Sequence, residues 1–116
     1  MKVMAVEEGD IVLVAIPQAG GELKNRPVLL HREVLPFNDF LACGIRTQLR
    51  QEVKGFDHPI NIHDPKFAQA GLVQDSLIRS GFLAIIQSNK ILGSIGKLDE
   101  RIRKELLQRV ARHLIQ

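Results

Sequence analysis

Short apolar segments that end at glycine, proline or charged turn residues follow one another along most of the chain, and this spacing limits the possible folds more than any other feature. The segment "DIVLVAIP" is rich in β-branched residues and lies between Gly9 and Pro17, which is typical of a buried strand. A flexible polar loop is expected over 18–25, and Pro27 should lie at the start of the next strand or on a sheet edge. The strands predicted in this way cover residues 10–17, 26–32, 40–47 and 58–63.

Two further apolar stretches, 73–80 and 82–87, flank Gly81. Glycine inside a strand marks a bulge or a bend, so the pattern predicts either two strands that meet at a bend or one long strand with a bulge. The preceding residues 64–71 are expected to form a loop or a single helical turn.

The apolar period changes to that of a helix beyond Lys97. Asp99 is a suitable N-cap, and Arg112 and His113 suit the last turn, where cations interact favourably with the helix dipole. We therefore predict a helix of about four turns that lays an apolar stripe on the sheet. The stripe consists of Ile102, Leu106, Val110 and Leu114, and the other side carries Arg101, Lys104, Glu105, Gln108 and Arg112.

Several short strands and one terminal helix describe a mainly β fold with a C-terminal α-helix, arranged as a small antiparallel barrel or sandwich. The 116 residues are expected to form one domain, 1–116. The single cysteine, Cys43, excludes an intramolecular disulfide and fits a reducing cytoplasm. The apolar runs are too short to span a bilayer, and the N-terminus turns acidic before a signal-peptide core develops. A soluble, cytoplasmic protein is expected.

The charge of the chain permits a polyanionic partner without requiring one, because the formal net charge is only +3. There is no Trp or Tyr and there are only five Phe, so stacking platforms for single-stranded nucleic acid are scarce. Any binding of nucleic acid is expected to rely on arginine and lysine.

Four strings follow one another in a particular order: "GDIVLVAIP" with a glycine-bearing loop, "RPVLL", "GIRTQ" and "GLVQDSLIR", with the helix closing the chain. Together they resemble the PemK/MazF family, the toxin halves of bacterial toxin–antitoxin pairs. A lone Gly-Asp or Arg-Pro would mean little, but two strands with their loop and Arg-Pro at a fixed place are specific. The resemblance implies a small SH3-like barrel, a homodimer, and a sequence-selective endoribonuclease that cleaves single-stranded RNA without metal or another cofactor. It also implies a cognate antitoxin that folds along the dimer and occludes the site.

RNA cleavage by attack of the 2′-hydroxyl on the adjacent phosphate needs a base, an acid and cations that stabilise the developing negative charge. Arginine suits the last task, because its planar fork pairs with two phosphate oxygens and stays charged. The resemblance assigns Arg26, Thr47 and Arg79 to the catalytic site. On residue type alone, Arg26 is more typical of an arginine that opens a strand on the surface, and Thr47 is also typical simply as a good strand former. The residues expected to bind RNA are Arg46, Gln48, Arg50, Glu22 and Lys24.

Three positions depart from the family pattern. Gly81 and Gly21 stand where some members carry an aspartate and a histidine, and Arg46 replaces a small hydroxyl residue. The acid and the base are therefore unassigned, because arginine at its normal pKa is a poor base. Either charge stabilisation by arginine dominates, or the barrel is non-catalytic. A non-catalytic barrel would bind RNA or DNA, or block a protein target, as relatives that inhibit DNA gyrase do.

The remaining polar candidates have simpler explanations. His31 and Arg26 are five residues apart on one predicted strand, hence on opposite faces and about 17 Å apart. His58 and His63 fit no strong metal-ligand spacing, and a solvated loop is expected there. Cys43 is expected to be a buried, small apolar residue.

Overall fold

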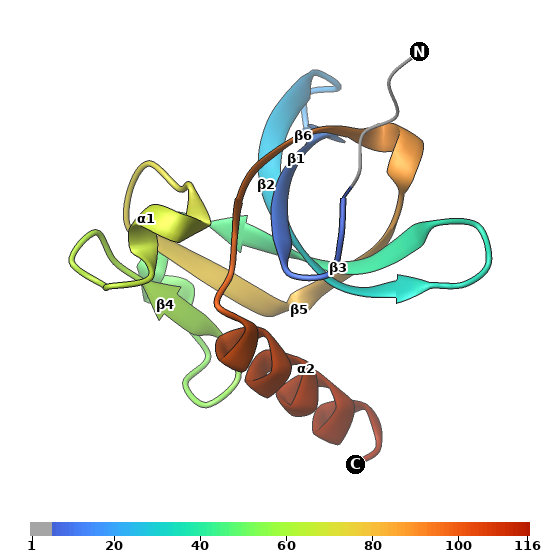
Figure 1. Ribbon diagram of the computed structural model, residues 1–116. Coiled ribbons are helices and arrows are strands. Elements are labelled where there is room, and N and C mark those ends of the chain that lie inside the picture. Colours follow the sequence, from blue (N-terminus) through green and yellow to red (C-terminus); the bar gives the residue numbers. More distant parts are fainter. Residues whose placement is uncertain (1–5) are drawn as a thin grey trace.

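A strongly curled antiparallel sheet forms most of the molecule, and a long helix lies against one side of it (Figure 1). The computed structural model describes residues 6–116, so the first five residues of the predicted domain lie outside the described part. The strands are β1 (Asp10–Pro17), β2 (Leu23–Val34), β3 (Asp39–Arg46), β4 (His58–Ile60), β5 (Ser76–Gln87) and β6 (Ile91–Lys97). They pair in the order β4-β5-β3-β2-β1-β6. The helices are α1 (Phe67–Ala70) and α2 (Glu100–Leu114), with 3-10 turns at Leu49–Gln51 and Ser88–Lys90.

The two faces of the sheet form two separate cores, because side chains alternate along each strand. The inner face curls on itself, and the outer face is covered by α2 (Figure 1). The inner core includes Val12, Val14, Val28, Leu30, Phe40 and Ala42. The outer core includes Ile11, Leu29, Cys43, Ile45, Ile78 and Leu106.

The predicted mainly β fold with a C-terminal helix is confirmed. Asp99 is the N-cap of α2, and its side chain accepts a hydrogen bond from the Ile102 N–H. Leu106 and Val110 are buried as predicted. Leu114 is 66% exposed, however, so the predicted apolar stripe ends one turn before the helix does. No helix within residues 6–116 is long and apolar enough to cross a membrane.

The hairpin between β1 and β2 is tighter than predicted. Residues 23–25 were expected in a polar loop, but they extend β2 by pairing with the end of β1, which leaves only 18–22 as the connection. Pro27 consequently lies inside β2 rather than at its start. The β2–β3 ladder begins only at Val28, so at Pro27 one side of the strand is unpaired and the missing N–H costs little.

Strand β6, whose sequence "ILGSIGK" contains two glycines, was not predicted. The strand forms by pairing with β1 through two register shifts. A Cβ on Gly96 would lie 2.2 Å from the carbonyl oxygen of Ala70, so glycine is required where β6 passes α1. The glycine therefore reflects close packing between distant segments, which no local pattern indicates.

Strand β5 is one continuous strand, as the second of the two alternatives for Gly81 predicted. Its pairing with β3 jumps from Ile45↔Ile78 to Cys43↔Leu83. Residues 79–82 therefore bulge opposite Gly44, and the ladder is regular on both sides of them.

Candidate active site

Three arginines from three neighbouring strands meet at one end of the inner face: Arg26 on β2, Arg46 on β3 and Arg79 on β5. We call them the arginine cluster. Partial burial lowers the pKa of Arg46, and the positive charges of Arg26 and Arg79 lower it further. Three like charges at close range repel one another, so the cluster favours an anion between them.

The bulge in β5 positions Arg79, the third member of the arginine cluster. The guanidinium carbon of Arg79 lies 4.2 Å from the ring centroid of Phe82, and that of Arg46 lies 5.3 Å from the same centroid. Gly44 lies beneath them, where an added Cβ would approach an Arg46 nitrogen to 3.3 Å. The bulge and the missing side chain at Gly44 together give the two guanidinium groups room to share one ring.

Arg26 is held by the loop of the β1–β2 hairpin. Its Nη2 donates a hydrogen bond to Gln18 Oε1 at 3.3 Å, and Gln18 Nε2 donates to the carbonyl oxygen of Ile16 at 2.9 Å. These two hydrogen bonds connect Arg26 through Gln18 to the backbone of β1, so the hairpin orients Arg26.

Arg79 is held from two directions. Its Nε lies 3.3 Å from Oδ2 of the buried Asp57, and its Nη1 donates a hydrogen bond to Gln51 Oε1 at 2.9 Å. Asp57 precedes β4 and Gln51 ends the 3-10 turn after β3. The segment between β3 and β4 therefore contributes two residues, Gln51 and Asp57, to the positioning of Arg79.

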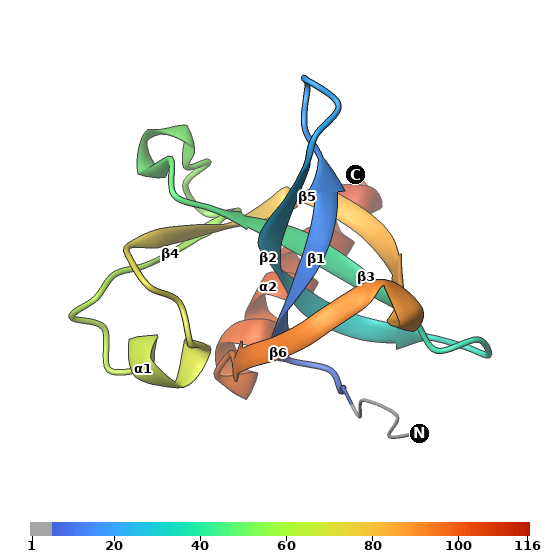
Figure 2. The same ribbon diagram turned by 90° about the horizontal axis from the view of Figure 1, so that it is seen from above.

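The other residues predicted for the site lie around the arginine cluster. Thr47 follows β3 directly and is exposed, and Gln48 and Arg50 are exposed on the adjoining 3-10 turn. Glu22 and Lys24 are exposed on the β1–β2 hairpin, which protrudes from the barrel (Figure 2). The structure thus brings Arg26, Arg46 and Arg79 together and places the remaining residues on two flanking segments.

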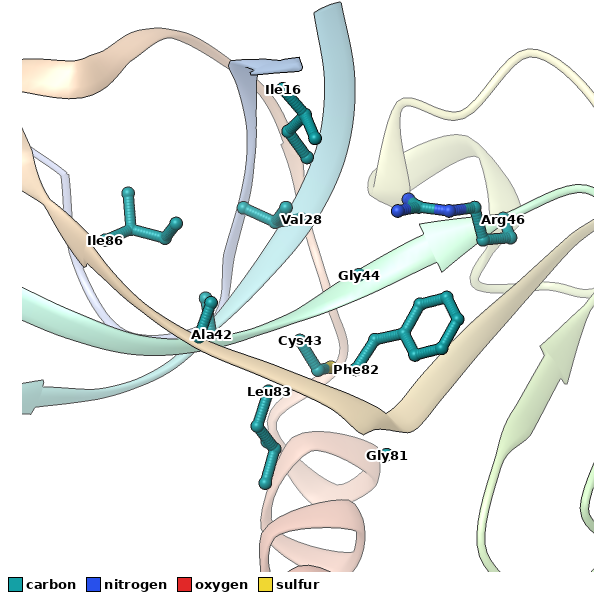
Figure 3. A pocket seen from close by; sticks show the side chains of 11 residues that line it. Ile16, Val28, Ala42, Cys43, Gly44, Arg46, Gly81, Phe82, Leu83 and Ile86 are labelled. Atoms are coloured by element: carbon teal, nitrogen blue, oxygen red, sulfur yellow. The ribbon is translucent and has the colours of Figure 1, made fainter. Parts of the chain in front are cut away.

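An apolar pocket of about 390 Å³ opens beside the arginine cluster. Figure 3 shows Arg46 and Phe82 at one end of the pocket and Ile86 at the other. The rest of the lining consists of aliphatic residues, glycines and Cys43, with Ile16, Val28, Ala42, Gly44, Gly81 and Leu83 among the contributors. Pockets of this character hold flat apolar groups next to a few polar contacts.

Sequence reasoning missed Gln18, Gln51, Asp57 and Phe82. Gln51 and Asp57 act on Arg79 from a distant segment, and the contacts of Gln18 and Phe82 depend on the hairpin and on the bulge, so no local spacing indicated these roles. Only the position of Gly81 between two strand-like stretches pointed to an irregularity at Phe82.

The histidines lie apart from the arginine cluster, whereas Cys43 lines the pocket beside it. His31 is fully buried, and the Arg103 guanidinium of α2 donates a hydrogen bond to its carbonyl oxygen. Cys43 is buried, as predicted, and burial raises the pKa of its thiol. Among the described residues, no group of three or more His, Cys, Asp or Glu is arranged to hold a metal ion.

The architecture is that of the small β barrels in which a curled antiparallel sheet is closed by a C-terminal helix. Within this class, residues 7–114 match the family model described as "PemK-like, MazF-like toxin of type II toxin-antitoxin system". The chain belongs to this family, and the predicted family membership and MazF-type barrel are confirmed.

A solved structure supports the fold assignment. The Mycobacterium tuberculosis toxin MazF-mt6 is similar with a TM-score of 0.64 and 22% sequence identity, over 91% of this chain and 96% of that chain. At this identity the likeness concerns the fold alone. No curated protein sequence matches the chain significantly.

Proposed function

We propose that the chain is a sequence-selective endoribonuclease toxin that cleaves single-stranded RNA without a metal ion and is neutralised by a cognate antitoxin. The observation that carries the proposal is the arginine cluster, which three strands assemble at one end of the barrel of a type II toxin–antitoxin family. Clustered guanidinium groups match the charge and geometry of a phosphate whose negative charge grows during the reaction.

In the proposed reaction, the 2′-hydroxyl attacks the adjacent phosphorus and loses its proton to solvent water, and the bond to the 5′-oxygen of the next nucleotide breaks, with that oxygen taking a proton from water. Arg26 and Arg79 pair with the non-bridging oxygens, and the Thr47 hydroxyl orients the ribose or the phosphate. Partial burial and the charges of Arg26 and Arg79 lower the pKa of Arg46, and its guanidinium adds a third positive charge near the leaving oxygen. Charge stabilisation dominates, because Gly81 and Gly21 supply no carboxylate or imidazole.

Sequence selection in this proposal comes from bases that leave the stack of the single strand. The pocket beside Arg46 has the size and apolar lining to accept one base. Gln48 and Arg50 on one side, and Lys24 and Glu22 on the other, contact the neighbouring nucleotides.

The test is incubation of purified protein with a long unstructured RNA, followed by analysis of the RNA ends. We expect discrete fragments that carry a 2′,3′-cyclic phosphate, as attack by the 2′-hydroxyl requires. Arg26→Ala should abolish them, whereas Arg101→Ala, which removes the same charge from an exposed position on α2, should not. Equal absence of cleavage in all three proteins would reject the proposal, and fragments with a plain 3′-hydroxyl would reject the mechanism.

One observation favours a second candidate, a non-catalytic barrel that binds nucleic acid or blocks a protein target. The glycines at 21 and 81 leave the site without the proton-transfer groups that some family members carry. Growth arrest upon expression that persists in Arg26→Ala and leaves cellular RNA intact would support this candidate over the nuclease.

We further propose that the protein acts in the cytoplasm as a homodimer and that the antitoxin binds along the dimer. Light scattering on the purified chain should give twice the 13.0 kDa mass of the monomer. A monomer at micromolar concentration would contradict this part of the proposal.

A further inference from the structure

A buried carboxylate stands directly behind the arginine cluster. The side chain of Asp57 is 1% exposed and forms an ion pair with Arg79, whose Nε lies 3.3 Å from Oδ2. Both carboxylate oxygens also accept backbone hydrogen bonds: Oδ2 from the Val53 N–H and Oδ1 from the Ser80 N–H, each at 2.9 Å. Burial of a charge is costly unless it is paired and hydrogen-bonded, and here both conditions are met.

The position of Asp57 is fixed from the far side by α2. Arg109 Nη1 donates a hydrogen bond to the Asp57 carbonyl oxygen at 3.1 Å, and the Phe56 ring stacks at a tilt on His113 with centroids 5.1 Å apart. Ser80 Oγ donates to the Phe56 carbonyl oxygen at 2.8 Å, which ties the same segment to β5. The carboxylate is therefore part of a rigid support and not of a mobile loop.

Three contacts immobilise the Arg79 guanidinium. The Asp57 carboxylate lies 3.3 Å from Nε as an ion pair without hydrogen-bond geometry, the Gln51 amide oxygen accepts a hydrogen bond from Nη1, and the Phe82 ring centroid lies 4.2 Å from the guanidinium carbon. Among the described residues nothing is bonded to Nη2, so this nitrogen is left for a ligand. A long side chain that is already fixed loses little conformational freedom when it pairs with a phosphate.

We propose that Asp57 is the positioning residue for Arg79 in the cleavage reaction, holding the guanidinium in the orientation that meets the phosphate. This inference rests on the proposed nuclease function. Asp57 does not touch RNA, because its carboxylate is enclosed, accepts hydrogen bonds from the Val53 and Ser80 N–H groups, and forms its ion pair with Arg79. It is thus not a replacement base for the aspartate that some members carry at the place of Gly81.

The first experiment is a double-mutant cycle on the full chain. Asp57→Asn keeps the shape of the side chain but removes the charge that faces Arg79. A misplaced catalytic group costs on the order of 100-fold, so kcat on an RNA oligonucleotide should fall about 10- to 100-fold with KM nearly unchanged. In the Arg79→Ala background, Asp57→Asn should cost nothing more, because Asp57 acts only through Arg79. An equal loss in both backgrounds, or no loss in either, would overturn the inference.

The matched control is Asp75→Asn. The Asp75 carboxylate also accepts a loop N–H, that of Ile62 at 2.8 Å, but forms no ion pair within residues 6–116. The kcat of Asp75→Asn should equal that of the wild type. A loss of kcat as large as that of Asp57→Asn would count against a specific role for Asp57.

If Asp57→Asn does not fold, as judged by thermal melting, Gln51→Ala replaces it in the cycle. Gln51 is exposed, so its truncation should leave the fold intact while it releases Nη1 of Arg79. A kcat reduced about three- to tenfold is expected from loss of one of the three contacts. Unchanged kcat would overturn the inference in this case.

A readout without RNA separates this inference from the proposed function. The Arg79 Nε–Hε signal, assigned in an ¹⁵N NMR spectrum by its loss in Arg79→Ala, should exchange slowly with water in the wild type. In Asp57→Asn or Gln51→Ala it should shift and exchange faster. An inactive wild type with this behaviour would reject the nuclease and keep the positioning contact, whereas an unchanged signal in both variants would reject the contact itself.

Discussion

Acid is expected to destabilise the protein through His31, whose side chain is fully buried. Burial, together with the charge of Arg103, lowers the pKa of His31 from 6.5 to about 4. Neither ring nitrogen has a hydrogen-bond partner within residues 6–116, so nothing there favours the protonated form. Protonation of this imidazole is therefore unfavourable in the native state and unhindered in the unfolded chain.

The sign and the size of this acid destabilisation follow from the pKa of His31 in the unfolded chain, 6.5, and in the native state, about 4. Between pH 6.5 and about 4 the unfolded chain binds a proton that the folded chain does not, so the free energy of unfolding decreases as the pH falls through this window. At ~1.4 kcal/mol per pH unit, the loss due to His31 reaches about 3 kcal/mol below pH 4. Above pH 6.5 the contribution vanishes.

The assay is urea unfolding of the wild type and of His31→Leu at several pH values across the window. Carboxylates such as Glu100, whose pKa is lowered by its hydrogen bond with Arg103, also destabilise the fold in acid, but they do so in both proteins. The difference between the two free energies of unfolding should therefore change by about 3 kcal/mol in favour of His31→Leu as the pH falls. His63→Leu, at an exposed position, is the control for loss of an imidazole. A difference between wild type and His31→Leu that stays constant with pH would refute the reasoning.

Further predictions concern packing and the arginine cluster. Gly96→Ala should destabilise the fold by more than about 2 kcal/mol in thermal or urea unfolding, because its Cβ would overlap the Ala70 backbone, whereas Gly93→Ala has nothing within 4 Å and should be nearly neutral. Leu106→Ala should cost about 2–5 kcal/mol, since this side chain is fully buried, and Leu114→Ala, at a position 66% exposed, should cost less than about 0.5 kcal/mol. Equal costs within either pair would contradict the assigned packing. Arg46→Lys should reduce the rate of RNA cleavage about tenfold or more, because an ammonium group lacks the planar face that lies over the ring, and an unchanged rate would remove Arg46 from the mechanism.

The parts of the fold that sequence alone predicted are those specified by neighbouring residues. The β-branched run of β1 and the four-residue apolar period of α2 are local patterns, and both elements appear where they were expected. Strand β6 depends instead on the contact of Gly96 with α1, and the full length of β2 depends on pairing with the end of β1. Such tertiary requirements leave no periodic signal in the chain.

The residues of the candidate site also fall into those that the sequence indicated and those that it did not. Arg26 and Arg79 were recognised because they stand in family strings, and the structure places them beside Arg46. Asp57 was not recognised, since it lies 22 residues before Arg79 and only the pairing of β4 with β5 brings the two segments together.

The bulge of β5 also bears on how a site like this can vary in evolution. Residues 79–82 lie between two stretches of regular pairing, Ser76–Ile78 and Leu83–Gln87, each held in register by its own ladder. A substitution within the bulge, or even the gain or loss of one residue there, leaves both ladders in phase. The pairing register of the barrel is therefore insulated from sequence changes at Arg79, Gly81 and Phe82, whereas Ser80, which is fully buried and hydrogen-bonded to Phe56 and Asp57, remains part of the fold.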